Sequence, residues 1–263
     1  MKKLPIGISD FKKLIEGNYI YVDKTEYIYR LIKQGGYYFL SRPRRFGKSL
    51  LLSTIEYLFK GERELFKGLY IEDRWNWNDI YPVIKIDFAK DIKSGKDLKE
   101  KTYQELRKNY IWNKEEIPKE LKDESILLEE LIMRVSEKEK KQVVVLVDEY
   151  DKPILDVIED KEEAEKVRKE LKALYSTLKG LDRYIKFVLI TGVSKFSKVS
   201  LFSGLNQLKD ISLNKEYGNI CGYTQDELEY YFKDYLEEVE KEEVKEWYNG
   251  YSFLSDRLYN PLK

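Results

Sequence analysis

Apolar residues along the chain form short continuous runs, separated by longer stretches with helical spacing. The most apolar run, residues 143–147, consists of Val and Leu without polar alternation. That pattern is typical of a central parallel strand covered on both faces. Aromatic or β-branched content between Gly, Pro or polar boundaries predicts further strands. They comprise residues 37–41, 83–88, 185–190 and, as the weakest prediction, 210–213.

The stretches between these runs carry apolar residues at the spacing of one helix face. They predict a helix after residues 47–49, two charged helices within 96–140 and a long helix from about 161 to 178. Strands that alternate with helices indicate parallel βαβ units, so the predicted class is α/β with an open parallel sheet. The buried stripe of the second charged helix is expected to be Leu127, Leu128, Leu131, Ile132 and Val135.

Capping boxes predict where two helices begin. Asp23 and Glu26 have the spacing of such a box before an apolar helix face, and Thr224 and Glu227 have the same spacing near the C-terminus. From Thr224 onward the pattern is helical, which predicts a small helical tail.

Length and composition limit the class of protein. A chain of 263 residues with 42% hydrophobic residues is long enough for one large α/β domain, or a core domain with a small lid. No apolar stretch approaches the ~20 residues of a membrane-spanning helix, and the first residues lack an apolar signal segment. The lone Cys221 fits a reducing compartment. We therefore expect a cytoplasmic protein that does not enter the membrane.

Histidine is absent from the chain. Its absence excludes Ser-His-Asp and Cys-His nucleophilic schemes, an imidazole base and a His-ligated zinc site. Acid–base chemistry would fall to carboxylates, lysines or tyrosines. Mg²⁺ remains the plausible metal, because hydroxyl, carboxylate and phosphate oxygens suffice to bind it.

The net charge of zero hides a polarised distribution. Residues 1–60 hold 12 Lys and Arg against 5 Asp and Glu, whereas residues 221–248 hold 3 against 10. A basic front and an acidic tail would favour head-to-tail association of two copies, or steer an anion towards the front. Two solvated helix faces are the simpler explanation.

The first chemical motif is the segment 41–49, Ser-Arg-Pro-Arg-Arg-Phe-Gly-Lys-Ser, between a predicted strand and a predicted helix. Backbone N–H groups at a helix N-terminus bind phosphate oxygens there, aided by the helix dipole. Gly47 would allow close approach, Lys48 would reach the β- and γ-phosphates and the Ser49 hydroxyl would bind Mg²⁺. The usual pattern begins with glycine, and here Arg42 takes that place.

The second motif is the carboxylate pair Asp148 and Glu149, at the end of the predicted strand 143–147. A buried strand that ends in acids is the expected Mg²⁺-binding partner of a phosphate loop. Asp148 would hold the metal, and Glu149 would orient or deprotonate the attacking water. A strand that simply ends in two solvent-exposed acids is an alternative explanation of this motif. It does not explain why a phosphate loop precedes the acidic pair and why both motifs lie on the expected elements.

A third element follows the strand 185–190. A polar side chain at the tip of this strand senses the γ-phosphate in ATPases of this architecture, and Thr191 is our first candidate, with Ser194 second. An ordinary Thr-Gly turn is the alternative explanation.

These stretches together resemble the predicted AAA-ATPase-like family of many bacteria and some archaea. The matching segments span nearly the whole chain, and the loop with two arginines is specific to the family. They comprise residues 4–7, 21–25, 39–49, 147–153, 191–197 and 247–253.

The resemblance implies a P-loop NTPase fold. The fold would have three layers, αβα, whose middle layer is a mostly parallel five-stranded sheet of order 5-1-4-3-2. A small helical C-terminal lid would follow. It also implies an ATPase core over residues 1–218, a lid or tail over 219–263, and an N-terminal segment 1–34 near the adenine, where Asp23 would lie. Family members often continue into a restriction-nuclease-like domain. We expect that domain to be missing here, in a truncated or short member, and carry over no nuclease activity.

Several residues therefore have predicted roles. The catalytic candidates are Glu149, Lys48, Thr191, Arg45 and Arg44, since either arginine would act as an arginine finger or merely neutralise nearby acids. The metal ligands would be Ser49 and Asp148. The nucleotide-binding candidates are Arg44, Arg45, Phe46, Gly47, Lys48, Ser49, Leu50 and Asp23.

The predicted function is Mg²⁺-dependent ATP hydrolysis that drives a molecular switch. The alternative is a slow or non-hydrolysing, nucleotide-gated scaffold for a partner. The partners considered are a second copy of the chain and a C-terminal effector domain. Nucleic acid is the weakest candidate, because the chain is neutral overall and lacks a recognisable nucleic-acid-binding signature.

Overall fold

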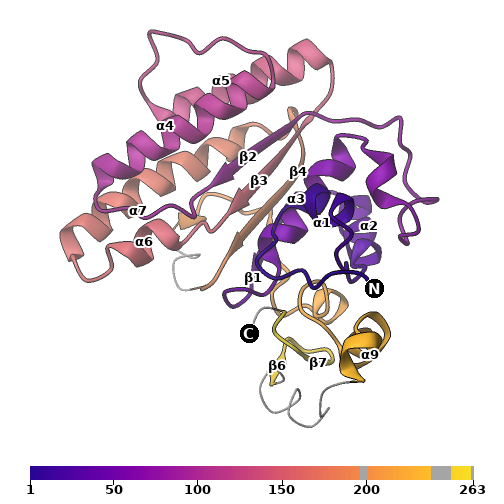
Figure 1. The fold of residues 1–263 in the computed structure, drawn as a ribbon. Coiled ribbons are helices and arrows are strands. Elements are labelled where there is room, and N and C mark those ends of the chain that lie inside the picture. The colour runs from indigo at the N-terminus through magenta and orange to yellow at the C-terminus, as the bar shows by residue number, and fades with distance from the viewer. Residues whose placement is uncertain (196–200, 238–249, 262–263) are drawn as a thin grey trace. The chain divides into compact units, whose positions relative to one another are not determined.

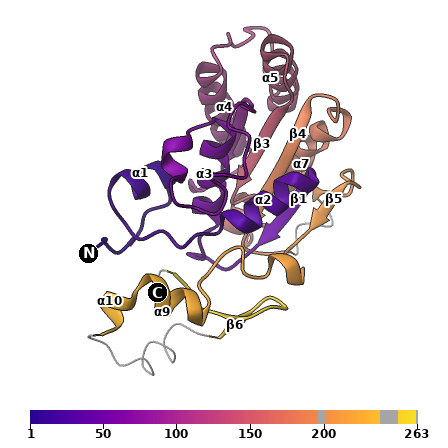
Figure 2. The same cartoon turned by 90° about the vertical axis from the view of Figure 1, so that its right-hand side faces the viewer.

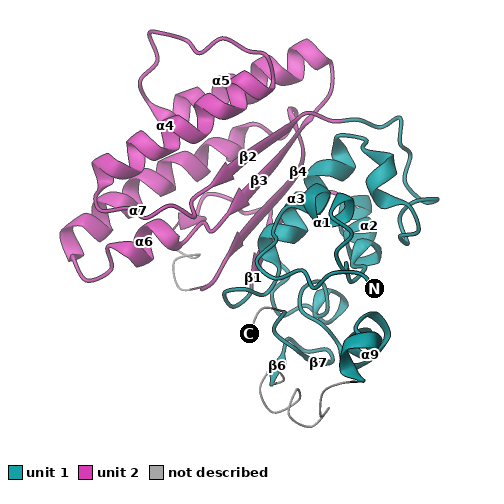
Figure 3. Ribbon diagram, viewed as in Figure 1, with its two compact units in different colours: residues 1–34, 42–80, 210–263 teal, residues 35–41, 81–209 magenta. Residues whose placement is uncertain are grey.

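The computed structural model describes residues 1–195, 201–237 and 250–261. The chain divides into two compact units (Figure 3). The first comprises Met1–Gln34, Arg42–Ile80 and Asp210–Lys263, and the second comprises Gly35–Ser41 and Tyr81–Lys209. Residues from 219 onward thus group with residues 42–49 of the predicted phosphate-loop segment, 41–49. A separate lid remains a prediction.

The second unit holds the four longer strands of a five-stranded sheet, whose order is β2-β3-β4-β1-β5 (Figure 1). The pairs β2–β3, β3–β4 and β1–β4 are parallel. This is the predicted α/β fold with the predicted strand order. The strands are β1 (Gly36–Ser41), β2 (Val83–Asp87), β3 (Val143–Asp148), β4 (Ile185–Gly192) and β5 (Leu208–Asp210).

The core strands lack alternation because both of their faces are covered. Every residue of β3 is buried, as the uninterrupted Val and Leu run predicts. β5 lies slightly earlier than predicted. The reason is Asp210, whose Oδ1 accepts a hydrogen bond from the Ser212 backbone N–H at 2.9 Å and turns the chain there.

Helices of the same unit pack on this sheet and on one another. α4 contacts β2, α5 contacts β3, and α4, α5 and α7 contact each other. Figure 1 shows these three helices running side by side. The predicted apolar stripe of α5 is confirmed, because all five of its residues are buried. The helices of this unit are α4 (Gly95–Trp112), α5 (Glu124–Glu139), α6 (Lys152–Asp156), α7 (Lys161–Ser176) and the 3-10 turn η2 (Thr177–Gly180).

Asn109 of α4 protects the edge of the sheet at β2. Its Oδ1 accepts from the Lys85 backbone N–H at 2.8 Å, and its Nδ2 donates to the Lys85 carbonyl at 2.7 Å. One side chain therefore satisfies both backbone groups of an edge-strand residue that would otherwise invite pairing with another chain.

The first unit is mostly helical, and Figure 2 shows its C-terminal segments, α9, α10 and β6, from a second side. The tail was expected to be helical, but it also contains the antiparallel hairpin of β6 and β7. The elements are α1 (Phe11–Glu16), α2 (Thr25–Gln34), α3 (Lys48–Phe59), η1 (Arg63–Phe66), η3 (Lys215–Tyr217), α9 (Gln225–Tyr231), α10 (Lys233–Leu236), β6 (Tyr251–Ser252) and β7 (Arg257–Leu258).

One of the two predicted capping boxes is present. Thr224 and Glu227 form it at the start of α9. Before α2, Asp23 Oδ1 instead accepts from the backbone N–H and the hydroxyl of Thr25, at 2.8 and 2.6 Å. Glu26 is engaged with Arg30 on the same helix. The two helix starts are joined by a partly buried ion pair, in which Lys24 Nζ lies 2.5 and 2.6 Å from the Glu227 carboxylate oxygens.

Across the described ranges, no helix is both long enough and apolar enough to cross a membrane.

Candidate functional site

The phosphate-loop segment connects the carboxyl end of β1 to the start of α3, as predicted. α3 begins at Lys48 and is preceded by Gly47 in the left-handed region at φ +91°, which favours glycine. The N-cap residue of α3 is this glycine, which has no side chain to accept from the N–H groups of the first turn. Backbone N–H groups at such a helix N-terminus are the arrangement that binds phosphate.

Arg45 is also left-handed, at φ +62°. A non-glycine residue in this region costs about 1–3 kcal/mol and persists only where its surroundings hold it. Such strain concentrates at functional sites. The Arg44 and Arg45 side chains are exposed, so both guanidinium groups can reach a ligand from solvent.

Lys48 is buried, and its ammonium group is directed back at the loop. Its Nζ donates to the carbonyls of Arg42 and Pro43, each at 2.9 Å. Ser49 and Leu50, the next residues of α3, are half-buried. The predicted phosphate-binding lysine is thus held inside the curve of its own loop.

Phe46 contributes differently from what the sequence suggests. Its side chain is completely buried and packs edge-on against Tyr251 and Phe253 of the C-terminal hairpin. Only its backbone is left to meet a ligand.

The second unit brings other candidates together at the carboxyl ends of its parallel strands. Leu40 of β1 pairs with Thr191 of β4, one residue before the loop segment begins at Ser41–Arg42. The Thr191 hydroxyl donates to Asp148 Oδ1 at 2.7 Å, and both residues are buried. The predicted sensor and the predicted metal ligand are therefore in direct contact.

Glu149 follows Asp148 in a left-handed conformation at φ +52°. The Glu149 backbone N–H donates to Asp148 Oδ1 at 3.1 Å, and its side chain is half-buried. The strained backbone conformation therefore lies directly after β3, at the residue predicted to orient or deprotonate the attacking water.

Ser194, the second sensor candidate, has another partner. Its hydroxyl and backbone N–H donate to Asp151 Oδ2 at 2.6 and 2.7 Å. Asp151 is fully buried and also accepts from the Val193 N–H, so these bonds hold the turn after β4. The motifs in the sequence did not indicate this role of Asp151.

Asp87 lies at the end of β2 and is the register partner of Asp148. Burial, with a lesser effect of the neighbouring Asp148 charge, raises the pKa of Asp87. Ala89 N–H donates to its Oδ1 at 2.8 Å and partly offsets this.

Asp23 uses both carboxylate oxygens within the first unit. Besides Thr25, it binds the Tyr70 N–H through Oδ2 at 2.7 Å. This structural role fastens the start of α2 to the 68–71 turn. A position beside adenine remains a prediction.

A family comparison classifies the chain. The family model described as "Predicted AAA-ATPase" matches residues 5–202. The chain belongs to this AAA-ATPase-like family. The match covers the phosphate-loop segment, Asp148, Glu149 and Thr191, and confirms the resemblance drawn from the motifs. Residues 196, 197 and 247–249 of the resembling stretches lie outside the described residues.

A curated relative extends the similarity over the whole chain. It is described as "Uncharacterized protein in vnfD 5'region" from Azotobacter chroococcum mcd 1. It is 46% identical over 263 residues, which cover 99% of this chain and 51% of the relative. The AAA-ATPase-like chain thus spans about half the length of this relative.

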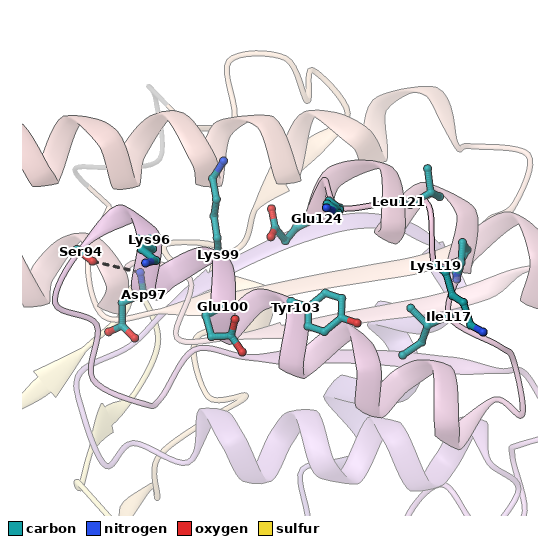
Figure 4. A pocket seen from close by; sticks show the side chains of 12 residues that line it. Ser94, Lys96, Asp97, Lys99, Glu100, Tyr103, Ile117, Lys119, Leu121 and Glu124 are labelled. Atoms are coloured by element: carbon teal, nitrogen blue, oxygen red, sulfur yellow. Dashed lines mark hydrogen bonds between the residues drawn. The ribbon is translucent and has the colours of Figure 1, made fainter.

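A separate hollow of about 900 Å³ lies between α4 and residues 117–124 (Figure 4). Lysines and acids alternate around it, and none of the predicted site residues lines it. Such mixed charge selects no single class of ligand. Its charged residues are Lys96, Lys99, Lys119, Lys122, Asp97, Glu100 and Glu124.

Proposed function

We propose that this AAA-ATPase-like chain binds ATP with Mg²⁺, hydrolyses it and acts as a molecular switch. The observation that carries the proposal is the strand–loop–helix segment, in which left-handed Arg45 and Gly47 precede α3 and Gly47 itself is the N-cap residue. This backbone is suited to a polyphosphate.

Each candidate residue has a role in the proposal. The N–H groups at the start of α3 and the Lys48 ammonium bind the β- and γ-phosphates. Glu149 orients the attacking water and takes up its proton. The water oxygen bonds to the γ-phosphorus, the bond from the γ-phosphorus to the bridging oxygen breaks, and ADP and inorganic phosphate leave. Thr191 responds to the γ-phosphate through its hydroxyl.

The donor set suits magnesium. Mg²⁺ is commonly bound by one or two protein oxygens together with substrate phosphates and water. The Ser49 hydroxyl and the Asp148 carboxylate would hold it. When bound, the ion neutralises charge on the phosphate oxygens. The Thr191 hydrogen bond at Oδ1 orients the Asp148 carboxylate for that role.

A nucleotide-gated scaffold with little turnover is the second candidate. It is favoured by Lys48, which is already bonded to two loop carbonyls, and by Arg42 at the place of the usual first glycine. In this alternative ATP binding orders the loop, and Glu149 has no catalytic task.

The wider setting is also proposed. A second copy or a C-terminal effector region is the partner class that we favour, since the relative is about twice as long. Direct nucleic-acid binding is the weakest alternative. We place the protein in the cytoplasm on its lone Cys221.

Equilibrium binding of a fluorescent ATP analogue tests the binding step. Lys48→Ala should weaken binding at least tenfold, and Ser49→Ala should remove the Mg²⁺ dependence. The matched control is Lys67→Ala, which replaces an exposed lysine that follows η1 in the same unit and should bind as the parent does. Equal binding by the Lys48 variant would contradict the assignment.

A further inference from the structure

Arg42 is unusual for a cation at a predicted anion site, because its side chain turns away from solvent. It is 1% exposed. Its Nη1 donates to the Ser212 carbonyl at 2.9 Å, and its Nη2 donates to the carbonyls of Tyr217 and Gly218, each at 3.2 Å. The guanidinium is therefore occupied by backbone oxygens of the 212–218 segment.

The same guanidinium stacks on the C-terminal hairpin. Its Cζ lies 3.8 Å from the centroid of the Phe253 ring, within cation–π range. A planar guanidinium can stack and donate in its own plane at once, which an ammonium cannot do. Burial lowers the pKa of Arg42 to about 10, so the group stays charged at neutral pH.

Phe46, at the other end of the loop, reaches the same hairpin. Its ring centroid lies 5.1 Å from that of Tyr251 and 5.6 Å from that of Phe253. Gly222 permits this packing, since a Cβ there would lie 2.4 Å from Cε1 of Phe46. Two side chains that precede Lys48 in the sequence, Arg42 and Phe46, therefore both attach the loop to the hairpin.

The backbone of Arg42 completes the connection to the predicted phosphate-binding group. Its carbonyl accepts one of the two hydrogen bonds from Lys48 Nζ. A continuous path of contacts therefore runs from Phe253 through the Arg42 guanidinium and carbonyl to Lys48.

We propose that Arg42 is a positioning residue, through which the hairpin of residues 251–258 holds the phosphate loop and Lys48 in position for nucleotide binding. The hairpin is in this view part of the nucleotide-binding apparatus of the chain. The inference rests on the proposed ATP binding. By linkage, if the hairpin affects ATP affinity, ATP must in turn affect the hairpin.

Two measurements on the full chain test this. Hydrogen exchange of the amides in 251–258 should slow when ATP binds to the unmodified chain, and should not change when ATP is added to Lys48→Ala. Arg42→Lys and Phe253→Leu should each raise the Kd for ATP about tenfold, with effects that are not additive in the double variant. Arg63→Lys, at an exposed arginine of η1 in the same unit but outside the hairpin, is the matched control and should leave the Kd unchanged.

The outcomes separate this inference from the function on which it rests. Unchanged exchange in 251–258 on saturation of the unmodified chain with ATP would overturn the role of the hairpin while leaving ATP binding intact. Failure of the unmodified chain to bind ATP at all would overturn both. The exchange measurement needs no variant, so a misfolded Arg42 variant does not obscure the result.

Discussion

The Thr191 hydroxyl donates a 2.7 Å hydrogen bond to Asp148 Oδ1 across the ends of β4 and β3. Both side chains are buried, so water does not replace this bond. It restrains the carboxylate that we assign to the metal, and it places a hydroxyl at the strand tip where a γ-phosphate would be sensed.

Thr191→Val should therefore impair turnover more than ATP affinity. The two side chains have nearly the same shape, but valine removes one of the two donors to Asp148 Oδ1 and leaves this buried oxygen with the Glu149 N–H alone. The loss should cost about 1 kcal/mol in unfolding free energy. The measurement is kcat and KM for ATP, with urea unfolding beside it. Thr191→Ser keeps the hydroxyl and is the control. Parent-like kcat in the valine variant would exclude this role.

Replacement of Arg45 by glycine distinguishes the backbone strain at this residue from the chemical role of its side chain. Arg45→Gly relieves the backbone at φ +62° and should raise the unfolding free energy by about 1 kcal/mol. If the guanidinium acts as an arginine finger, the same variant should lower kcat by about 10³-fold or more. Stability and turnover would then change in opposite directions.

Arg44→Ala serves as the comparison, because Arg44 is equally exposed but is not among the residues with positive φ. Parent-like kcat in both variants would show that neither arginine acts in cis, and would leave charge neutralisation as their role.

Replacement of Asp87 by asparagine should stabilise the fold, by an amount that depends on pH. Its folded pKa is raised, so the folded chain holds this proton more tightly than the unfolded chain does. Ionisation of Asp87 therefore destabilises the fold as the pH rises through that pKa. Asp87→Asn should melt at a higher temperature than the parent near pH ~7, and the difference should vanish towards pH ~4, where the unfolded carboxyl begins to protonate.

The expected increase is small, since the protein removes only part of the water around the Asp87 carboxylate, and the residue remains exposed enough for solvent to screen its charge. Thermal melts across this pH range measure it, with Asp73→Asn, at an exposed acid of the other unit, as the control. A variant that is less stable at neutral pH would contradict the sign.

The apolar runs predicted β1, β3 and β4 well because these strands are buried along almost their whole length. The 143–147 run became β3, and its end placed Asp148 and Glu149 as expected. The strand order did not follow from these runs. It came from the resemblance to the family, because hydrophobic pattern carries no information on which strands are neighbours.

Other features depended on contacts that leave little trace in the sequence. The partners of Arg42 are backbone carbonyls 170 to 176 positions away. Every residue has a backbone carbonyl, so the sequence does not indicate which of them a distant side chain binds. The sequence showed only that an arginine replaced the usual glycine. Likewise, the β5 boundary depended on the Asp210 side chain, and Asp23 bound a distant backbone N–H rather than a capping box.

Phosphate release from ATP by the purified chain, with and without Mg²⁺, tests the central claim most directly. Glu149→Gln and Lys48→Ala are assayed beside the parent. We predict Mg²⁺-dependent release by the parent, loss of release with retained and tighter ATP binding in Glu149→Gln, and loss of both in Lys48→Ala. Parent-like release from either variant, or no Mg²⁺-dependent release by a parent that binds ATP, would contradict the ATPase assignment, and the second result would favour the nucleotide-gated scaffold.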